Sequence, residues 1–157
     1  RVSPVDFVPK LEAEGGIRRL TDFVLARAMD DLRHRSDIRV SVNASASEFQ
    51  DAGFALRVVK AALAGRFPPE RLEIEVTETA MLDVEAARRS LMALKGAGIA
   101  VALDDFGAGF TSLHALRELP FTTLKVDASF VERCDTDTAS AAIIHAVIGV
   151  GRALGMK

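Results

Sequence analysis

The sequence predicts an α/β fold in which parallel strands alternate with helices. Four short apolar segments are each followed by a helical pattern, and this order implies parallel strands joined by right-handed crossovers. Each segment also ends in polar residues, as expected where strands of a barrel deliver side chains to its mouth. A doubly wound sheet is the competing architecture, but it gives less reason for every strand to contribute to one site.

Helical patterns separate the apolar segments, and most of them have clear end signals. Gly15 and Gly16 divide the first two helices, Asp83 caps the fourth, and Pro120 closes the fifth. Apolar residues recur at helical spacing between these signals. The expected helices are residues 7–14, 18–35, 54–63, 83–96, 112–119 and 138–154.

The strands are more informative when they are read by alternation. Leu72, Ile74 and Val76 point to one side of the second strand. Glu73 and Glu75 point to the other side, whereas a parallel strand buried on both faces would be apolar throughout. One polar face near the carboxyl ends therefore favours a barrel mouth. The expected strands are residues 40–43, 72–78, 99–103 and 124–127.

Two adjacent carboxylates, Asp104 and Asp105, follow the apolar run 99–103 and precede the glycine-rich run 106–109. Such a pair at the end of a buried strand is costly unless it holds a cation. Because the other strands also end in polar residues, we expect one site built from several strand ends.

Composition sets the limits of function. The chain has 157 residues, of which 49% are hydrophobic, and this is enough for one packed domain. Lys and Arg number 20 against 22 Asp and Glu, so no electrostatic argument favours duplex nucleic acid or a membrane surface. Cys134 is the single cysteine, which fits a reducing, cytoplasmic location. No signal peptide or membrane span is expected, since residues 139–154 are interrupted by His145 and Arg152.

Four motifs, in order, resemble those of the EAL-domain cyclic di-GMP phosphodiesterases. They are SVNAS at 41–45, LEIEVTE at 72–78, ALDDFGAGF at 102–110 and LKVDASFV at 124–131. The opening PVDFVP at 4–9 also resembles the first helix region of that family. The resemblance implies part of a (β/α)₈ TIM-like barrel that hydrolyses cyclic di-GMP to linear pGpG with Mg²⁺ or Mn²⁺, in bacterial second-messenger signalling.

The resemblance also implies roles for individual residues. Its metal ligands would be Asn43, Glu75, Asp104 and Asp105. Lys125 would be the partner of the attacking water, Asp105 would take part in catalysis, and Glu78 would steady the loop 106–112. Carboxylate and amide oxygens favour Mg²⁺ or Mn²⁺ over zinc, and two such ions could stabilise both oxygens of an in-line displacement. Asp127 is expected at the same mouth without an assigned role.

The chain departs from the family pattern in three places. The Glu-Ala-Leu segment would lie before residue 1, and the Glu-Gly-Val-Glu region would follow Lys157. We therefore expect residues 1–157 to be the central portion of the domain, truncated at both ends, and inactive by themselves. Ala108 and Phe110 replace the Thr and Tyr that are usual in the family's loop.

Other functions remain open at this point. A noncatalytic cyclic di-GMP receptor or protein-interaction module is the main alternative, and a barrel enzyme acting on another phosphodiester is the weaker one. The Asp-Phe-Gly run at 105–107 lacks the other kinase motifs, and 107–109 lacks a complete dinucleotide-binding turn. Histidines 34, 114 and 145 are scattered on helices, which favours surface or packing roles over metal ligation. A homodimer and regulatory domains outside the segment are compatible with the sequence.

Overall fold

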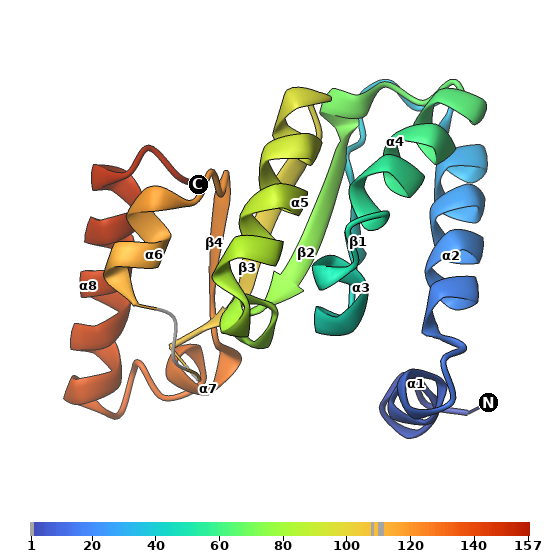
Figure 1. Cartoon of the computed structure of the whole chain (residues 1–157). Coiled ribbons are helices and arrows are strands. Elements are labelled where there is room, and N and C mark those ends of the chain that lie inside the picture. Colours follow the sequence, from blue (N-terminus) through green and yellow to red (C-terminus); the bar gives the residue numbers. More distant parts are fainter. Residues whose placement is uncertain (1, 108, 110–111) are drawn as a thin grey trace.

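A computed structural model describes residues 2–107, 109 and 112–157 of the chain. Within these residues, a four-stranded parallel sheet has the order β1-β2-β3-β4 (Figure 1). The strands are β1 (Val40–Asn43), β2 (Leu72–Thr77), β3 (Ala100–Phe106) and β4 (Thr123–Val126). Consecutive strands are neighbours, which is the order of a barrel wall. The substitutions at positions 108 and 110 lie outside the described residues.

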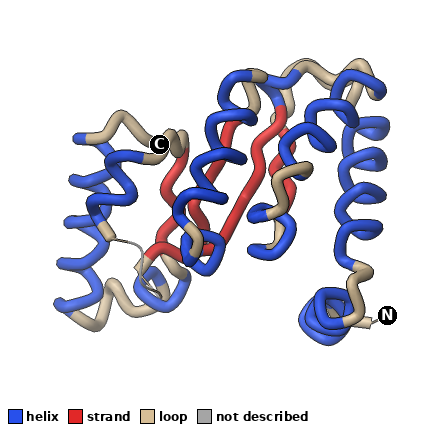
Figure 2. The backbone as a smooth tube through the Cα atoms, viewed as in Figure 1, coloured by secondary structure: helices blue, strands red, loops and turns tan. Residues whose placement is uncertain are grey.

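Helices connect the strands, and the longer ones stand along the sheet, whereas the first helix lies crosswise at the N-terminal end (Figures 1 and 2). The described α-helices are α1 (Pro4–Ala13), α2 (Ile17–Leu32), α3 (Ala46–Gln50), α4 (Phe54–Ala64), α5 (Val84–Gly96), α6 (Leu113–Glu118), α7 (Ala128–Val131) and α8 (Thr138–Ala153). Two 3₁₀ helices flank β2: η1 (Pro69–Arg71) before it and η2 (Glu78–Leu82) after it. Asp83 caps α5 by accepting a hydrogen bond from the backbone N–H of Ala86.

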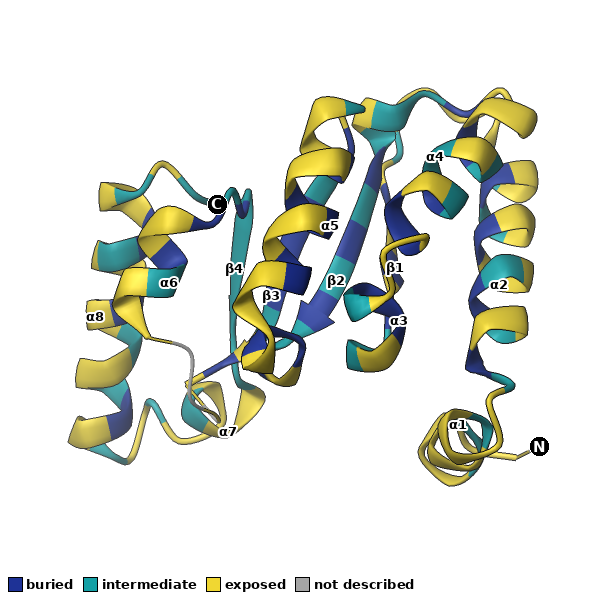
Figure 3. Cartoon of the chain, viewed as in Figure 1, coloured by how far each residue is buried: buried dark blue, intermediate teal, exposed yellow. Residues whose placement is uncertain are grey.

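The apolar face of the sheet forms the core. Val42, Ile74 and Val101 lie side by side in register, and each is at most 4% exposed. Leu103 continues this face on β3 and is fully buried. Figure 3 shows α2, α4 and α5 with exposed outer surfaces and buried residues on their inner sides. The strands therefore have one dry face, which the helices cover, and one polar face.

The predicted alternation of helices and parallel strands is confirmed, but several boundaries differ. The third strand does not end at Leu103, because Asp104 continues the ladder opposite Thr77 and the strand runs to Phe106. The first helix begins at Pro4 rather than Phe7. The short helices α3 and α7 were not predicted, since four or five residues show no periodicity. No helix in the described ranges is long and apolar enough to cross a bilayer.

Candidate active site

The candidate site lies where the four strands end. Asn43 of β1 lies opposite Glu75 of β2, and Asp104 of β3 lies one layer further along, opposite Thr77. Lys125 of β4 completes the set from the other side of β3. Parallel strands place their carboxyl ends at one edge, so residues far apart in the sequence meet here.

Lys125 joins the two carboxylates at the centre of this mouth. Its Nζ donates hydrogen bonds to Oε2 of Glu75 and to Oδ2 of Asp104, both at 2.9 Å. The Lys125 side chain is 39% exposed, against 12% for Glu75 and 19% for Asp104. Burial alone would lower the pKa of Lys125, but the hydrogen bonds and charges of Asp104 and Glu75 outweigh it and raise the pKa. The lysine is therefore held as a cation.

Asp105 follows in a left-handed backbone conformation, with φ at 54°. The register between β3 and β4 shifts between Leu103 and Phe106, so the normal alternation of side chains is interrupted here. Burial and the negative charges of Asp104 and Asp127 raise the pKa of Asp105, while Lys125 acts in the opposite direction. These charges make the position of the exposed Asp105 carboxylate electrostatically unfavourable.

Asp127 has a local structural role. Its carboxylate accepts hydrogen bonds from the backbone N–H and the hydroxyl of Ser129 and caps α7. These bonds lower the pKa of Asp127. The carboxylate is therefore ionised, and its charge still reaches Asp105.

Glu78 lies at the start of η2 and is 9% exposed. Its Oε1 accepts a long hydrogen bond, 3.5 Å, from the backbone N–H of Gly107. Oε2 is buried without a hydrogen-bond partner among the described residues. A Cβ at position 109 would overlap the Glu78 carboxylate, so only glycine allows this close approach. This contact is consistent with the predicted role of Glu78 in steadying the loop after β3.

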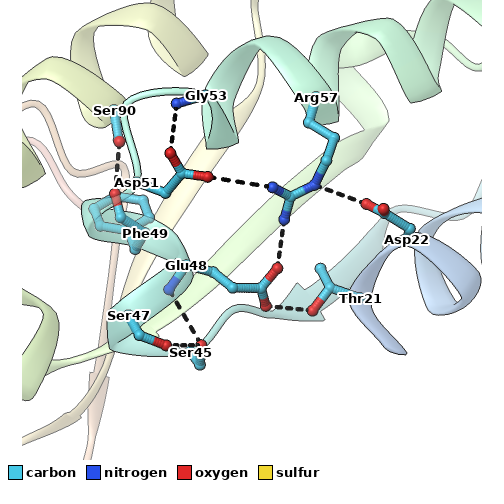
Figure 4. A network of polar contacts seen from close by, with 10 residues as sticks. All are labelled: Thr21, Asp22, Ser45, Ser47, Glu48, Phe49, Asp51, Gly53, Arg57 and Ser90. Carbon is cyan, nitrogen blue, oxygen red and sulfur yellow. Dashed lines mark hydrogen bonds and ion pairs between the residues drawn. The ribbon is translucent and has the colours of Figure 1, made fainter. Parts of the chain in front are cut away.

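A buried ion-pair network beyond the predicted residues supports the chain after Asn43 (Figure 4). Glu48 of α3 is 5% exposed, accepts a hydrogen bond from Thr21 at 2.5 Å and pairs with Arg57 of α4. Arg57 also donates to Asp22 of α2 at 2.8 Å. The network ties α2 and α4 to α3, the helix that follows β1.

Sequence reasoning missed the Glu48 network. Its available signal was Ser45 followed three residues later by Glu48, which is the pattern of a helix start. Ser45 indeed caps α3 by accepting the N–H of Glu48. The distant partners Thr21 and Arg57 could not be inferred from that pattern, because tertiary packing brings them together.

The donor types at the mouth fit a hard divalent cation. Asn43, Glu75, Asp104 and Asp105 offer only oxygen, which Mg²⁺ and Mn²⁺ prefer. In the described part of the chain, no group of three or more His, Cys, Asp or Glu side chains is arranged as a metal site. Instead, the ammonium group of Lys125 lies between two of the carboxylates. Two of the four predicted ligands, Glu75 and Asp104, thus contact a lysine. Histidines 34, 114 and 145 are exposed.

A parallel α/β sheet with acidic, amide and lysine side chains at its carboxyl end places the chain in the class of α/β barrel proteins. The sequence model of the EAL domain family matches residues 1–157, and the chain belongs to this family. This confirms the resemblance and the predicted fold class.

Relatives and solved structures agree with the family assignment. MucR of Pseudomonas aeruginosa, named a bifunctional diguanylate cyclase/cyclic di-GMP phosphodiesterase, is 36% identical over 162 residues, 99% of this chain and 24% of its own length. The cyclic di-GMP phosphodiesterase PA2567 of the same organism is 34% identical over 161 residues, 99% of this chain and 27% of its own. The structure of the PaMucR phosphodiesterase in complex with c-di-GMP has a TM-score of 0.94 and 36% identity, and the match covers 99% of this chain and 66% of that one. The chain thus spans about a quarter of the length of these curated relatives.

Proposed function

We propose that the protein carrying this chain hydrolyses cyclic di-GMP to linear pGpG in a metal-dependent reaction. The single observation behind the proposal is the pairing of Lys125 with both Glu75 and Asp104 at the strand ends. A receptor would need groups that bind the nucleotide, but it has no need for a lysine held between two carboxylates. A noncatalytic receptor is therefore the alternative outcome of the test.

In this proposal Asn43, Glu75, Asp104 and Asp105 hold Mg²⁺ or Mn²⁺. When bound, the metal supplies an activated water and stabilises charge on the phosphodiester. Lys125 keeps a fixed positive charge beside the reacting phosphate, because Glu75 and Asp104 maintain its protonation. Glu78 positions the loop after β3 through the backbone of Gly107. We further propose that the site works in the cytoplasm.

We also propose that residues 1–157 form the central portion of a longer barrel domain. A pocket of about 810 Å³ lies between β1 and the two N-terminal helices, and Phe7, Leu20 and Val24 contribute apolar surface to it. β1 is an edge strand of the described sheet, so the backbone groups along its outer edge face the pocket. An additional strand there would cover both the edge and the apolar surface.

The test uses the full-length protein with Mn²⁺ or Mg²⁺ and measures the conversion of cyclic di-GMP to pGpG. We expect turnover that a chelator abolishes and either metal restores. Nucleotide binding with no product in either metal would contradict the proposal and identify a receptor. A parallel assay with a linear dinucleotide checks whether the cyclic substrate is preferred.

A further inference from the structure

We propose that Ala102 is a positioning residue that determines where the Lys125 ammonium group lies. This inference rests on the proposed function, because Lys125 is the cation beside the reacting phosphate. It concerns a residue outside the predicted site. The order of the strands and two hydrogen bonds that cross β3 support this role of Ala102.

Lys125 and Glu75 are not on neighbouring strands. Lys125 belongs to β4 and Glu75 to β2, with β3 between them in the sheet. Neighbouring strands are about 4.8 Å apart, so the two backbones are separated by roughly 9.6 Å. The 2.9 Å hydrogen bond from Nζ to Oε2 therefore has to pass over the face of β3.

The residue of β3 that lies in this path is Ala102. Its Cα is in register with Glu75 on one side and with Thr123, two residues before Lys125, on the other. Ala102 alternates with Val101 and Leu103, which point into the core, so it belongs to the polar face. It is nevertheless 0% exposed. A small residue on an otherwise open polar face has no exposure when longer side chains pass over it.

A second crossing occurs one layer below. The hydroxyl of Thr123 on β4 donates to Oε2 of Glu73 on β2 at 2.8 Å, again across β3. The residue of β3 opposite Glu73 is Ala100. The Thr123–Glu73 bond passes between Ala100, opposite Glu73, and Ala102, opposite Thr123, so both crossings of β3 run over alanine.

A larger side chain at position 102 would fill the path of the lysine. Valine would add two methyl groups opposite Glu75, where the ammonium group of Lys125 reaches that carboxylate, and its stiff side chain could not turn away easily. The ammonium group would then lose Glu75, while the carboxylates themselves would keep their places on the strands. The size of residue 102 thus decides whether Lys125 joins Glu75 to Asp104.

The experiment compares Ala102→Val with the matched control Ala100→Val in the full-length protein. Ala100 is on the same strand and face and borders a pocket of about 590 Å³. Like Ala102 it flanks the Thr123–Glu73 bond, so the control accounts for any disturbance of that bond, but it lies one layer away from Glu75. We expect Ala102→Val to lower the single-turnover rate roughly 10- to 100-fold with nucleotide affinity changed by less than about 3-fold. The control is expected to remain within about 3-fold of the unmodified protein in both measurements.

A double-mutant cycle separates positioning from a general structural effect. In a Lys125→Ala background, Ala102→Val should lower the rate by no more than about 2-fold, because the lysine it displaces is already absent. An equal loss in both backgrounds would overturn the inference. A crystal structure of Ala102→Val gives a readout without turnover: the inference requires Nζ of Lys125 to have left Oε2 of Glu75, and retention of that hydrogen bond overturns it.

A smaller variant keeps the test decisive if Ala102→Val does not fold. Ala102→Ser adds one atom to the same path, and we expect a smaller rate loss that also disappears in the Lys125→Ala background. Full activity of Ala102→Ser with an unchanged lysine position would overturn the inference. If the unmodified protein shows no hydrolysis, the proposed function fails, whereas the crystal structures still test the placement of Lys125.

Discussion

The two faces of the parallel sheet obey different physical rules. On the helix-covered face, Ile74, Val101 and Leu103 are at most 1% exposed and pack with one another and with the helices. On the opposite face, Glu75 and Lys125 form ion pairs while keeping partial contact with solvent. Burial of apolar area stabilises the first face without directional requirements. The second face depends on the position of individual atoms, so substitutions there should affect chemistry more than stability.

The largest expected effect comes from a substitution on the polar face that lowers activity and leaves stability nearly unchanged. Asp104→Asn keeps the shape of the side chain but removes a charge that pairs with Lys125 and that we propose binds metal. We expect turnover of cyclic di-GMP to fall roughly 100- to 1,000-fold, with a far-ultraviolet circular dichroism spectrum and melting temperature close to those of the unmodified protein. Near-normal hydrolysis would remove Asp104 from the proposed site.

A substitution on the apolar face of the same strand should have the opposite effect, a loss of stability with little change in activity. Leu103→Ala removes a fully buried side chain adjacent to Asp104 in the sequence. We expect the free energy of unfolding to fall by about 2–5 kcal/mol in a denaturant titration. Nucleotide hydrolysis per folded molecule should change far less than in Asp104→Asn. A loss of stability below about 1 kcal/mol would contradict the distinction between the faces.

The smallest expected effect is a stabilisation. Asp105→Asn removes a carboxylate that has a raised pKa and a left-handed backbone, a conformation that asparagine tolerates well. Without divalent metal, we expect the variant to unfold at a slightly higher temperature, by roughly 1–2 °C. Thermal melts in a chelator measure this shift. Addition of Mn²⁺ should stabilise the unmodified protein more than the variant, and an equal response would argue against Asp105 as a ligand.

The raised pKa of Asp105 also predicts that the stability of the metal-free protein depends on pH. Because the pKa of Asp105 is higher in the folded protein than its ordinary value of 3.8, folding favours the protonated form. Ionisation of Asp105 therefore lowers the free energy of unfolding as the pH rises from about 3.8 through the raised pKa of the folded state. Melts of the metal-free protein across this range should show that the advantage of Asp105→Asn grows with pH. A constant advantage at all pH values would assign the effect to the backbone alone.

The sequence by itself determined the parallel α/β class, because helical and strand periods alternate and need no distant contact to be recognised. It also identified which face of β2 is polar, since Glu73 and Glu75 alternate with apolar residues over a short segment. The motifs placed the candidate residues at the strand ends. Their common location followed from parallel topology, because the carboxyl ends of parallel strands share one edge.

Only the tertiary structure decided which of these groups touch. The register of β3 and β4 places Lys125 between Glu75 and Asp104, and no local pattern records a contact across 50 residues. Glu48 was likewise a helix-start signal in the sequence and became a buried partner of Arg57 in the fold. Ala102 gave no signal at all, because an alanine acquires a role only when longer side chains have to pass over it. Local patterns specify elements and faces, whereas side-chain partners depend on how distant strands align.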